Sequence, residues 1–309
     1  SLLVSSDVNK IEFGDCRDLM SKWITEGVKV QTCITSPPYF GLRDYGHEGQ
    51  IGLESEVGDY VRNLVDVFAL VRDLLCEDGT LWLNLGDSYS GSGKGPSKSL
   101  NGEHHNLEHK HSKIVPDGLK PKDLIGIPWR VAFALQADGW YLRQDIIWHK
   151  PNPMPESVRD RCTKNHEYIF LLSKSPKYYF DNESIKEPVK EDWGTRDRTN
   201  GKYHNEGSGL QPHSGLEKSY EMANKRSVWT VTTKPFHGAH FAVFPPDLIE
   251  PCVLAGSKPL DIVLDPFMGS GTTAAVAQRL NRQYLGCELN TDYEPLQKDR
   301  LKQPSLELL

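Results

Sequence analysis

One short stretch of the chain decides the fold: Ile262-Val263-Leu264-Asp265-Pro266-Phe267-Met268-Gly269-Ser270-Gly271-Thr272-Thr273-Ala274. Its apolar start predicts a buried strand over 261–264, and the small residues at its end predict a helix over 272–280. The glycines between them let the backbone approach a ligand closely, and the start of a helix presents free N–H groups. The spacing Gly269-x-Gly271-x-x-Ala274 is close to the dinucleotide-binding fingerprint. The stretch predicts a cofactor-binding turn; a turn that binds nothing is the alternative.

An acidic residue further on indicates a cofactor that contains adenosine. Glu288 lies 19 residues after Gly269, at the end of a strand expected over 284–288, where a carboxylate can accept hydrogen bonds from two ribose hydroxyls. A phosphate-binding P-loop would need a lysine before Thr272, so ATP and GTP are disfavoured. A nicotinamide cofactor stays open, but Asp265 would repel its pyrophosphate. An aspartate at that point suits a cationic group, such as the amino group of S-adenosylmethionine.

A second motif, Thr35-Ser36-Pro37-Pro38-Tyr39, follows an apolar strand expected over Val30 to Thr35. Two consecutive prolines exclude a helix and fix an extended backbone. The Ser36 hydroxyl and the Pro37 carbonyl would then form a row of hydrogen-bond acceptors, with the aromatic face of Tyr39 beside them. Such a row fits a planar base that carries an exocyclic amino group. A plain turn at the end of a strand is the alternative for this motif taken alone.

The amine of such a base attacks an electrophile poorly, because its lone pair is delocalised into the ring. Acceptors that hold both amine protons push the nitrogen toward tetrahedral geometry and stabilise the positive charge that develops during attack. Alignment of the nitrogen with a methyl carbon and its sulfur leaving group supplies the rest through proximity. The two motifs together therefore indicate methyl transfer to a base amine.

The rest of the chain alternates short apolar strands with helical patterns, which is typical of a parallel α/β sheet. Two polar stretches, 88–123 and 181–235, interrupt the alternation, and loops this long are usually functional or disordered. We expect helices over 57–75, 127–136, 246–255 and from 292 onward, and further strands over 80–85, 141–148 and 166–172.

Composition excludes several classes of protein. The 309 residues are 38% hydrophobic and 25% charged, as in soluble globular proteins of one large or two ordinary domains. No apolar run approaches the roughly 18 residues of a membrane span, and the first residues do not resemble a signal peptide. Six cysteines without a CxxC pair indicate a reduced, cytoplasmic setting. The histidines of the 88–123 stretch match no metal-ligand spacing, so no metal site is predicted.

The formal net charge of −6 argues at first against a nucleic-acid partner. The charge is unevenly distributed, however. Residues 90–234 carry 23 Lys and Arg against 18 Asp and Glu, a balance of +5, and the remainder of the chain has a balance of −11. The basic excess therefore lies in the middle of the chain, which contains both polar stretches, and we expect moderate salt dependence of nucleic-acid binding.

The two motifs, in this order, resemble those of the DNA amino-methyltransferases, which methylate N4 of cytosine or N6 of adenine. The catalytic motif precedes the cofactor motif, which is the permuted, beta arrangement of that family. The resemblance covers most of the chain and extends to four further segments: Gly14-Asp15-Cys16, residues 78–87, Arg226-Ser227-Val228-Trp229 and His240-Phe241-Ala242-Val243-Phe244-Pro245.

The resemblance implies a Rossmann-like fold for an S-adenosylmethionine-dependent methyltransferase. Its sheet would be seven-stranded and mostly parallel, with one antiparallel strand and an inserted target recognition region. The expected division is a catalytic half over 1–180, which includes a flexible loop over 88–123, a target recognition region over 181–235, and a cofactor-binding half over 236–309.

The same resemblance, combined with the motif chemistry, gives three sets of candidate residues. The catalytic set is Ser36, Pro37, Pro38 and Tyr39. The S-adenosylmethionine set is Asp15, Cys16, Thr35, His240, Phe244, Asp265, Pro266, Phe267, Gly269, Ser270, Gly271, Thr272 and Glu288. The DNA-binding set is Lys150, Arg159, Arg161, Arg196, Arg198, Lys202, Lys225 and Arg226, and a solvated charged surface is the alternative for each of these.

Within the family, a serine before Pro-Pro is associated with cytosine and an aspartate or asparagine with adenine. Ser36 therefore favours N4 methylation of a flipped cytosine in double-stranded DNA, with N6 of adenine as the alternative. A nicotinamide-dependent oxidoreductase is a more remote alternative, which leaves Ser36 to Tyr39 unexplained. No nuclease motif is evident, so any cognate restriction endonuclease would be a separate partner; a monomer and a homodimer both stay open.

Overall fold

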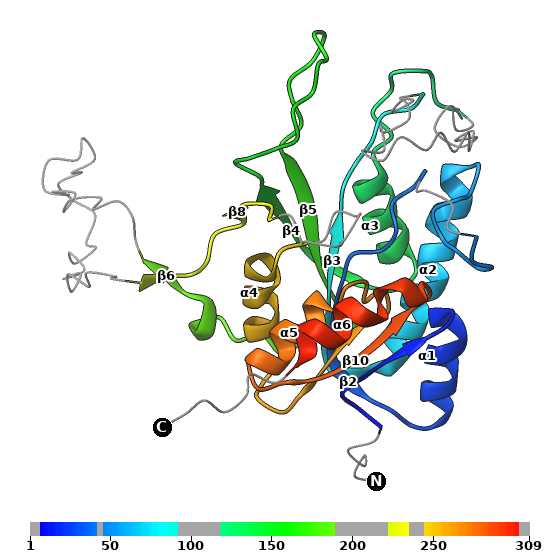
Figure 1. Ribbon diagram of the computed structural model, residues 1–309. Coiled ribbons are helices and arrows are strands. Elements are labelled where there is room, and N and C mark those ends of the chain that lie inside the picture. Colours follow the sequence, from blue (N-terminus) through cyan, green and yellow to red (C-terminus); the bar gives the residue numbers. More distant parts are fainter. Residues whose placement is uncertain (1–6, 42–45, 92–117, 189–221, 235–243, 303–309) are drawn as a thin grey trace, which may run out of the picture.

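A mixed sheet forms the centre of the protein (Figure 1). The computed structural model describes residues 7–41, 46–91, 118–188, 222–234 and 244–302. Within these residues the sheet has eight strands in the order β1-β10-β9-β2-β3-β5-β4-β8. Their bounds are β1 (Lys10–Phe13), β2 (Val30–Thr35), β3 (Leu75–Leu85), β4 (Tyr141–His149), β5 (His166–Ser173), β8 (Val228–Thr230), β9 (Ile262–Asp265) and β10 (Gln283–Glu288).

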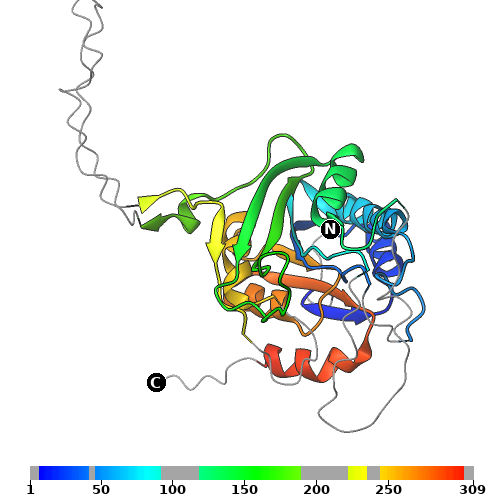
Figure 2. The same cartoon turned by 90° about the horizontal axis from the view of Figure 1, so that it is seen from above.

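Helices cover both faces of the sheet, as the view in Figure 2 shows. One layer contains α1 (Cys16–Thr25), α2 (Val57–Leu74) and α3 (Ile127–Ala137). The other contains α4 (Pro246–Gly256), α5 (Thr272–Arg279) and α6 (Glu294–Leu301). Short 3-10 helices occupy Glu183–Ile185 and Thr291–Tyr293, and β6 (Glu187–Pro188) pairs with β7 (Met222–Ala223) away from the main sheet. None of the helices in the described part of the chain is long and apolar enough to cross a membrane.

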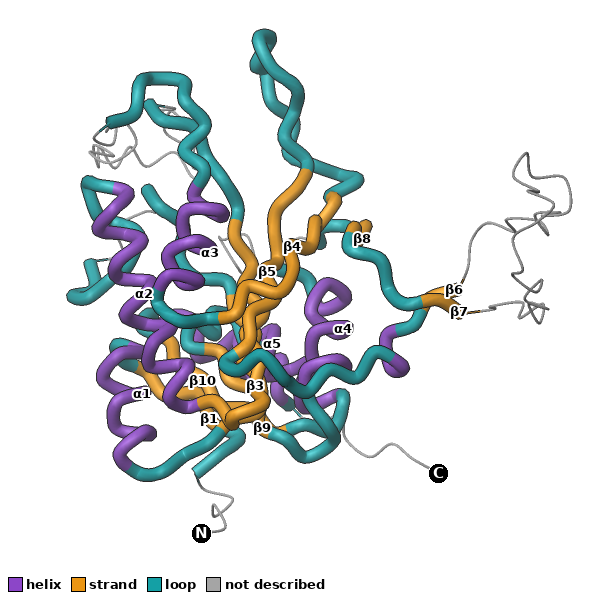
Figure 3. The backbone as a smooth tube through the Cα atoms, turned by 180° about the vertical axis from the view of Figure 1, so that it is seen from behind, coloured by secondary structure: helices purple, strands orange, loops and turns teal. Residues whose placement is uncertain are grey.

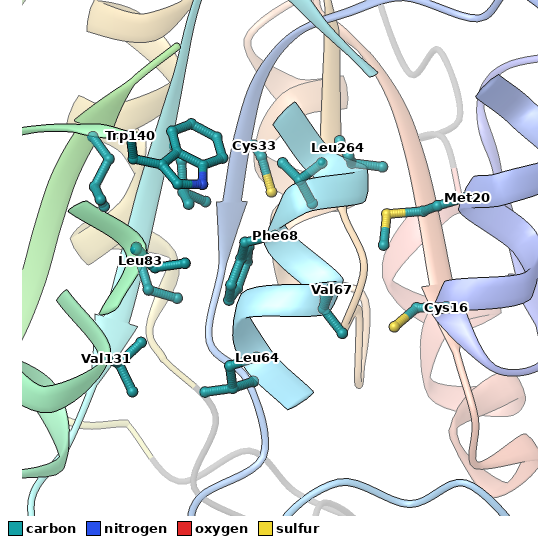
Figure 4. Packing of buried hydrophobic residues seen from close by; sticks show 14 of the residues in the cluster. Cys16, Met20, Cys33, Leu64, Val67, Phe68, Leu83, Val131, Trp140 and Leu264 are labelled. Atoms are coloured by element: carbon teal, nitrogen blue, oxygen red, sulfur yellow. The ribbon is translucent and has the colours of Figure 1, made fainter. Parts of the chain in front are cut away.

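The two layers follow from side-chain alternation in the central strands. Successive strand residues point to opposite faces, so Cys33 packs under α2 while its neighbour Ile34 packs under α4. In α2, Leu64, Val67 and Phe68 are fully buried and recur at helical spacing. Figure 4 shows these side chains packed against the strands of the sheet. Burial of each such side chain stabilises the fold by about 1.5–3 kcal/mol.

The relative directions of the strands determine at which edge of the sheet each strand ends. In the main sheet, β5 runs antiparallel to its neighbours β3 and β4, while the described pairs β1–β10, β10–β9, β9–β2, β2–β3 and β4–β8 are parallel. Apart from β5, the strands therefore end at the same edge. The expected α/β class with a mostly parallel sheet and one antiparallel strand is confirmed.

The structure differs from the sequence prediction in three places. The sheet has eight described strands rather than seven, because β8 adds a three-residue edge strand that is too short to show an apolar alternation. The predicted helix 57–75 ends at Leu74, and β3 begins at once at Leu75, with residues 76–79 bulging opposite Gln31. The predictions also omitted β1 and α1, whose residues are weakly apolar.

Candidate active site

The carboxyl edge of the sheet holds a cavity of about 360 Å³. Its walls come from the loops after β1, β2, β9 and β10, so the glycine turn and the Ser-Pro-Pro-Tyr motif meet although more than 200 residues separate them in the chain. Ligands of open α/β sheets bind at this edge, where the strand order changes direction. The lining includes Gly14, Asp15, Cys16, Ser36, Pro37, Pro38, Tyr39, Phe244, Pro266, Phe267, Met268, Gly269, Ser270, Glu288, Leu289 and Asn290.

Asp265 joins the two motifs beneath the cavity. Its carboxylate is fully buried and accepts hydrogen bonds from Thr35 Oγ1 (2.6 Å), the Phe267 backbone N–H (2.9 Å) and Thr273 Oγ1 (2.7 Å). Burial raises the pKa of Asp265 to about 6, and the hydrogen bonds oppose this shift. Asp265 is not among the residues that line the cavity. Its carboxylate therefore fixes the start of the glycine turn to β2.

Glu288 lines the cavity and also shapes it. Its Oε1 accepts a hydrogen bond from the Gly269 N–H at 3.0 Å, and its Oε2 accepts one from the Asn290 N–H at 3.1 Å. Burial raises the pKa of Glu288, and the two backbone donors oppose the shift. Each carboxylate oxygen accepts more than one hydrogen bond, so Glu288 can hold the glycine turn and still accept from a ligand hydroxyl.

The glycine turn leaves room for a ligand at close range. Gly269 has φ of +55° and Gly271 has φ of +91°, a region that side chains other than glycine rarely adopt. Nothing lies within 4 Å of a Cβ built on Gly269. Between them, Ser270 lines the cavity with a buried hydroxyl that has no hydrogen-bond partner among the described residues. A buried polar atom without a partner is costly, so this hydroxyl favours a polar ligand group beside it.

The opposite wall of the cavity is built on α1. Asp15 caps the helix by accepting from the Arg17 N–H at 2.9 Å, and its carboxylate also accepts from the Arg17 guanidinium. The guanidinium in turn donates to the Gly49 carbonyl at 2.9 Å, which seats the loop before α2 against the cavity. A Cβ on Gly49 would lie 2.6 Å from Asp15 Oδ2, so only glycine fits there. Burial raises the pKa of Cys16 to about 12, so its thiol stays neutral in this wall.

The Ser-Pro-Pro-Tyr loop is held from below by two hydrogen bonds. Tyr60 Oη donates to the Pro38 carbonyl at 2.6 Å, and Tyr39 Oη donates to Glu167 Oε1 at 2.6 Å. The pKa of Tyr39 is well above its usual value because of burial and the neighbouring carboxylate, so the phenol stays protonated. Ser36, whose hydroxyl hydrogen-bonds the Tyr39 phenol, lines the cavity together with Pro37 and Pro38.

Glu167 is central to the support under Tyr39, and sequence reasoning missed it. It is 8% exposed, forms an ion pair with Lys150 and accepts a weak hydrogen bond from Asn84 Nδ2 at 3.4 Å. A charged residue that is almost fully buried is uncommon unless it is paired. The partners of Glu167 lie in β3, in the loop after β2 and at the end of β4, so they are distant from it in the sequence. Only the acidic residue inside the apolar strand 166–172 could have signalled it.

The structure brings together part of the expected cofactor set. Asp15, Cys16, Phe244, Pro266, Phe267, Gly269, Ser270 and Glu288 line the cavity, whereas Thr35, Asp265, Gly271 and Thr272 lie outside its lining. His240 is outside the described residues. Sequence reasoning missed the lining residues His47, Gly49, Gln50, Ile51 and Tyr293, because their loops carry no motif.

The expected DNA-binding residues separate into three groups. Arg159 and Arg226 are exposed. Lys150, Arg161 and Lys225 are engaged within the protein, in ion pairs with Glu167, Glu156 and Glu187 respectively. The remaining three, Arg196, Arg198 and Lys202, lie outside the described residues.

Comparisons with known proteins agree with this geometry. The family model described as DNA methylase matches residues 30–299. The type II methyltransferase M.SmaI of Serratia marcescens is 49% identical over 293 residues, which are 94% of this chain and 90% of that protein. The PvuII DNA methyltransferase, named as cytosine-N4-specific, has a TM-score of 0.64 at 17% identity and covers 97% of this chain and 88% of its own. The protein TTHA0409 of Thermus thermophilus, solved with S-adenosylmethionine, has a TM-score of 0.58 at 22% identity and covers 95% of this chain and 93% of its own.

The Thr35–Asp265 hydrogen bond gives a stability prediction. We expect Thr35→Val to lower the free energy of unfolding by about 1–3 kcal/mol, because it leaves a buried carboxylate oxygen short of a donor. Urea unfolding followed by tryptophan fluorescence measures the change. Thr25→Val is the matched control, since Thr25 is exposed at the end of α1 and should change stability by no more than about 0.5 kcal/mol. Equal stabilities of the two variants would contradict the role given to Thr35.

Proposed function

Because the chain belongs to the DNA methylase family and is an S-adenosylmethionine-dependent DNA methyltransferase, we propose that it methylates the exocyclic N4 amine of cytosine in duplex DNA. One observation carries the proposal: the Ser36-Pro37-Pro38-Tyr39 loop and the glycine turn line a single cavity. The amine is unreachable inside the base stack, so the target nucleotide would be flipped out of the duplex into this cavity.

The residues of the cavity fit S-adenosylmethionine, which supplies a methyl group on a positively charged sulfur. Glu288 would accept hydrogen bonds from the ribose hydroxyls while it holds the Gly269 N–H. The apolar surfaces of Ile51, Phe244 and Phe267 offer contact for the adenine ring. The unpartnered Ser270 hydroxyl would hydrogen-bond a polar group of the same ligand.

The catalytic loop would act on the base amine. The Ser36 hydroxyl and the Pro37 carbonyl would accept hydrogen bonds from its two N–H groups and stabilise the positive charge that develops on nitrogen. As the N–C bond forms, the bond between the methyl carbon and sulfur breaks, and the methylated nitrogen then releases one proton to solvent. The Tyr60 bond to the Pro38 carbonyl fixes the direction of this extended segment. Tyr39, tethered to Glu167 at its hydroxyl, would present its ring to the face of the base. None of these roles needs a group that changes its protonation state.

The choice of cytosine over adenine rests on Ser36, since a serine before Pro-Pro is associated with methylation of cytosine in this family. Adenine N6 presents the same two donors to the same acceptors and is therefore the alternative outcome of the experiment below.

The DNA contacts would come from the basic residues near the cavity and in the target recognition region 181–235. Arg159 and Arg226 are the described candidates with exposed side chains, and phosphate contacts by such residues set affinity without specifying sequence. A separate endonuclease with the same recognition sequence would complete a restriction–modification pair in the cytoplasm.

The reaction product tests the proposal. After incubation of an unmethylated plasmid with the purified chain and S-adenosylmethionine, digestion to nucleosides and mass spectrometry should detect N4-methylcytosine. N6-methyladenine instead would replace the cytosine assignment with the adenine one. If several plasmids of different sequence all lack both modified nucleosides after the incubation, the cytosine and the adenine assignments are both contradicted.

Ser36→Ala tests the acceptor row. We expect the single-turnover rate of methyl transfer to fall about 10²–10³-fold, as when one preorganised charge-stabilising group is lost from an active site. Calorimetry should find the Kd for S-adenosylmethionine nearly unchanged. Ser175→Ala is the control, because Ser175 is half-buried and lies just after β5, beyond the edge of the sheet opposite the cavity. A Ser36→Ala enzyme with the wild-type rate would show that the hydroxyl is not a catalytic acceptor.

Glu288→Ala tests the cofactor assignment. Loss of a charged acceptor of hydrogen bonds costs about 1.5–3 kcal/mol, so the Kd for S-adenosylmethionine should rise about 10- to 100-fold in calorimetry. Glu250→Ala is the control variant, because Glu250 of α4 is half-buried, pairs with Arg279 and does not line the cavity. Circular dichroism checks that both variants fold. Weaker DNA binding with unchanged cofactor binding would refute the ribose role.

A further inference from the structure

The loop between β4 and β5, residues 150–165, forms a finger beside the active site. Figures 1 and 3 show it extending past the ends of both strands. Because β4 is parallel to β3, it ends at the edge of the sheet that holds the cavity. The finger is also linked to the catalytic loop at its base, since Lys150 pairs with the same Glu167 that holds the Tyr39 hydroxyl.

Hydrogen bonds and prolines stiffen this finger. At the base, Asn152 Nδ2 donates to the Thr233 carbonyl at 3.0 Å, and Asn152 Oδ1 accepts from the Thr233 N–H at 3.0 Å. Across the finger, Glu156 Oε2 accepts from Arg161 Nη1 at 2.8 Å and from the Lys164 N–H at 3.0 Å. Prolines at 151, 153 and 155 restrict the outgoing strand of the loop.

This stiffened finger presents an apolar side chain to solvent. Met154 is 84% exposed, more than any other exposed large hydrophobic residue of the described chain. It stands between Pro153 and Pro155, which restrict the backbone on both sides of it. Of the four basic residues of the loop, Lys150 and Arg161 form ion pairs within the protein, whereas Arg159 is exposed. An exposed cation near Met154 suits a polyanion better than an apolar protein surface.

We propose that Met154, with its flanking prolines, is a wedge that enters the base stack of the duplex beside the flipped nucleotide. This rests on the proposed function, because a wedge is useful where a base leaves the stack. Methionine and proline are among the side chains that enter base steps and unstack them. The finger would approach the phosphates, and Met154 would replace the stacking contacts that the neighbouring bases lose when the target base is flipped out.

Rate measurements on two duplexes test the wedge. Both carry the sequence that the wild-type protein methylates, and in one the base opposite the target is replaced by an abasic site, which lowers the cost of flipping. We expect Met154→Ala to slow single-turnover methyl transfer about tenfold or more on the paired duplex, because the lost stacking is not replaced. The rate on the abasic duplex should stay close to that of the wild type. Met154→Leu, which keeps an apolar wedge, should retain the wild-type rate on both.

Leu260→Ala is the matched control, because Leu260 is 66% exposed in the turn before β9, at the edge of the sheet away from the cavity. The wedge is overturned if Met154→Ala keeps the wild-type rate on the paired duplex. It is also overturned if that variant is slowed equally on both duplexes, which would indicate a role other than flipping. If the wild type methylates neither duplex nor any plasmid, the proposed function fails first and the wedge fails with it.

Discussion

The buried carboxylate of Asp265 is the interaction on which the rest of the site depends. Its hydrogen bond from Thr35 fastens the last residue of β2 to the last residue of β9. Its other donors, Phe267 N–H and Thr273 Oγ1, belong to the turn and helix that follow. One side chain therefore sets the distance between the Ser-Pro-Pro-Tyr loop and the glycine turn. Methyl transfer requires the reacting atoms to be aligned, so the rate of the reaction would depend on that distance.

A second buried carboxylate supports the other side of the cavity. Glu167 belongs to β5, the antiparallel strand, and reaches the catalytic loop through Tyr39 and the finger through Lys150. The two carboxylates have separate roles, because Asp265 positions the end of β2 against the glycine turn and Glu167 positions Tyr39 against the loop that follows β4. The loops that line the cavity are therefore held in place by buried residues in the central strands.

The sequence predicted the fold class and family correctly, because the signals were local. The strand–glycine–helix pattern at 262–274 and the Ser36 to Tyr39 motif each depend on residues adjacent in the chain, and the cavity contains both. What it could not predict depends on distant partners. The ion pair of Lys150 with Glu167 and the three donors around Asp265 each join segments far apart in the chain, so the sequence could not reveal them. The roles assigned to single residues remain predictions.

Burial of Asp265 also links the folding of this protein to proton uptake. The pKa of its carboxyl is about 6 in the folded chain and near 3.8 when exposed, so between these values the folded state binds a proton that the unfolded state releases. The stability that this group contributes is fully present below pH 3.8 and is lost as the pH rises through about 6, which is opposite to the behaviour of a salt-bridged carboxylate. At neutral pH the Asp265 carboxyl is therefore in its charged form, which burial makes less favourable. The hydrogen bonds from the two threonine hydroxyls and the Phe267 amide reduce the free-energy cost of burying this charge.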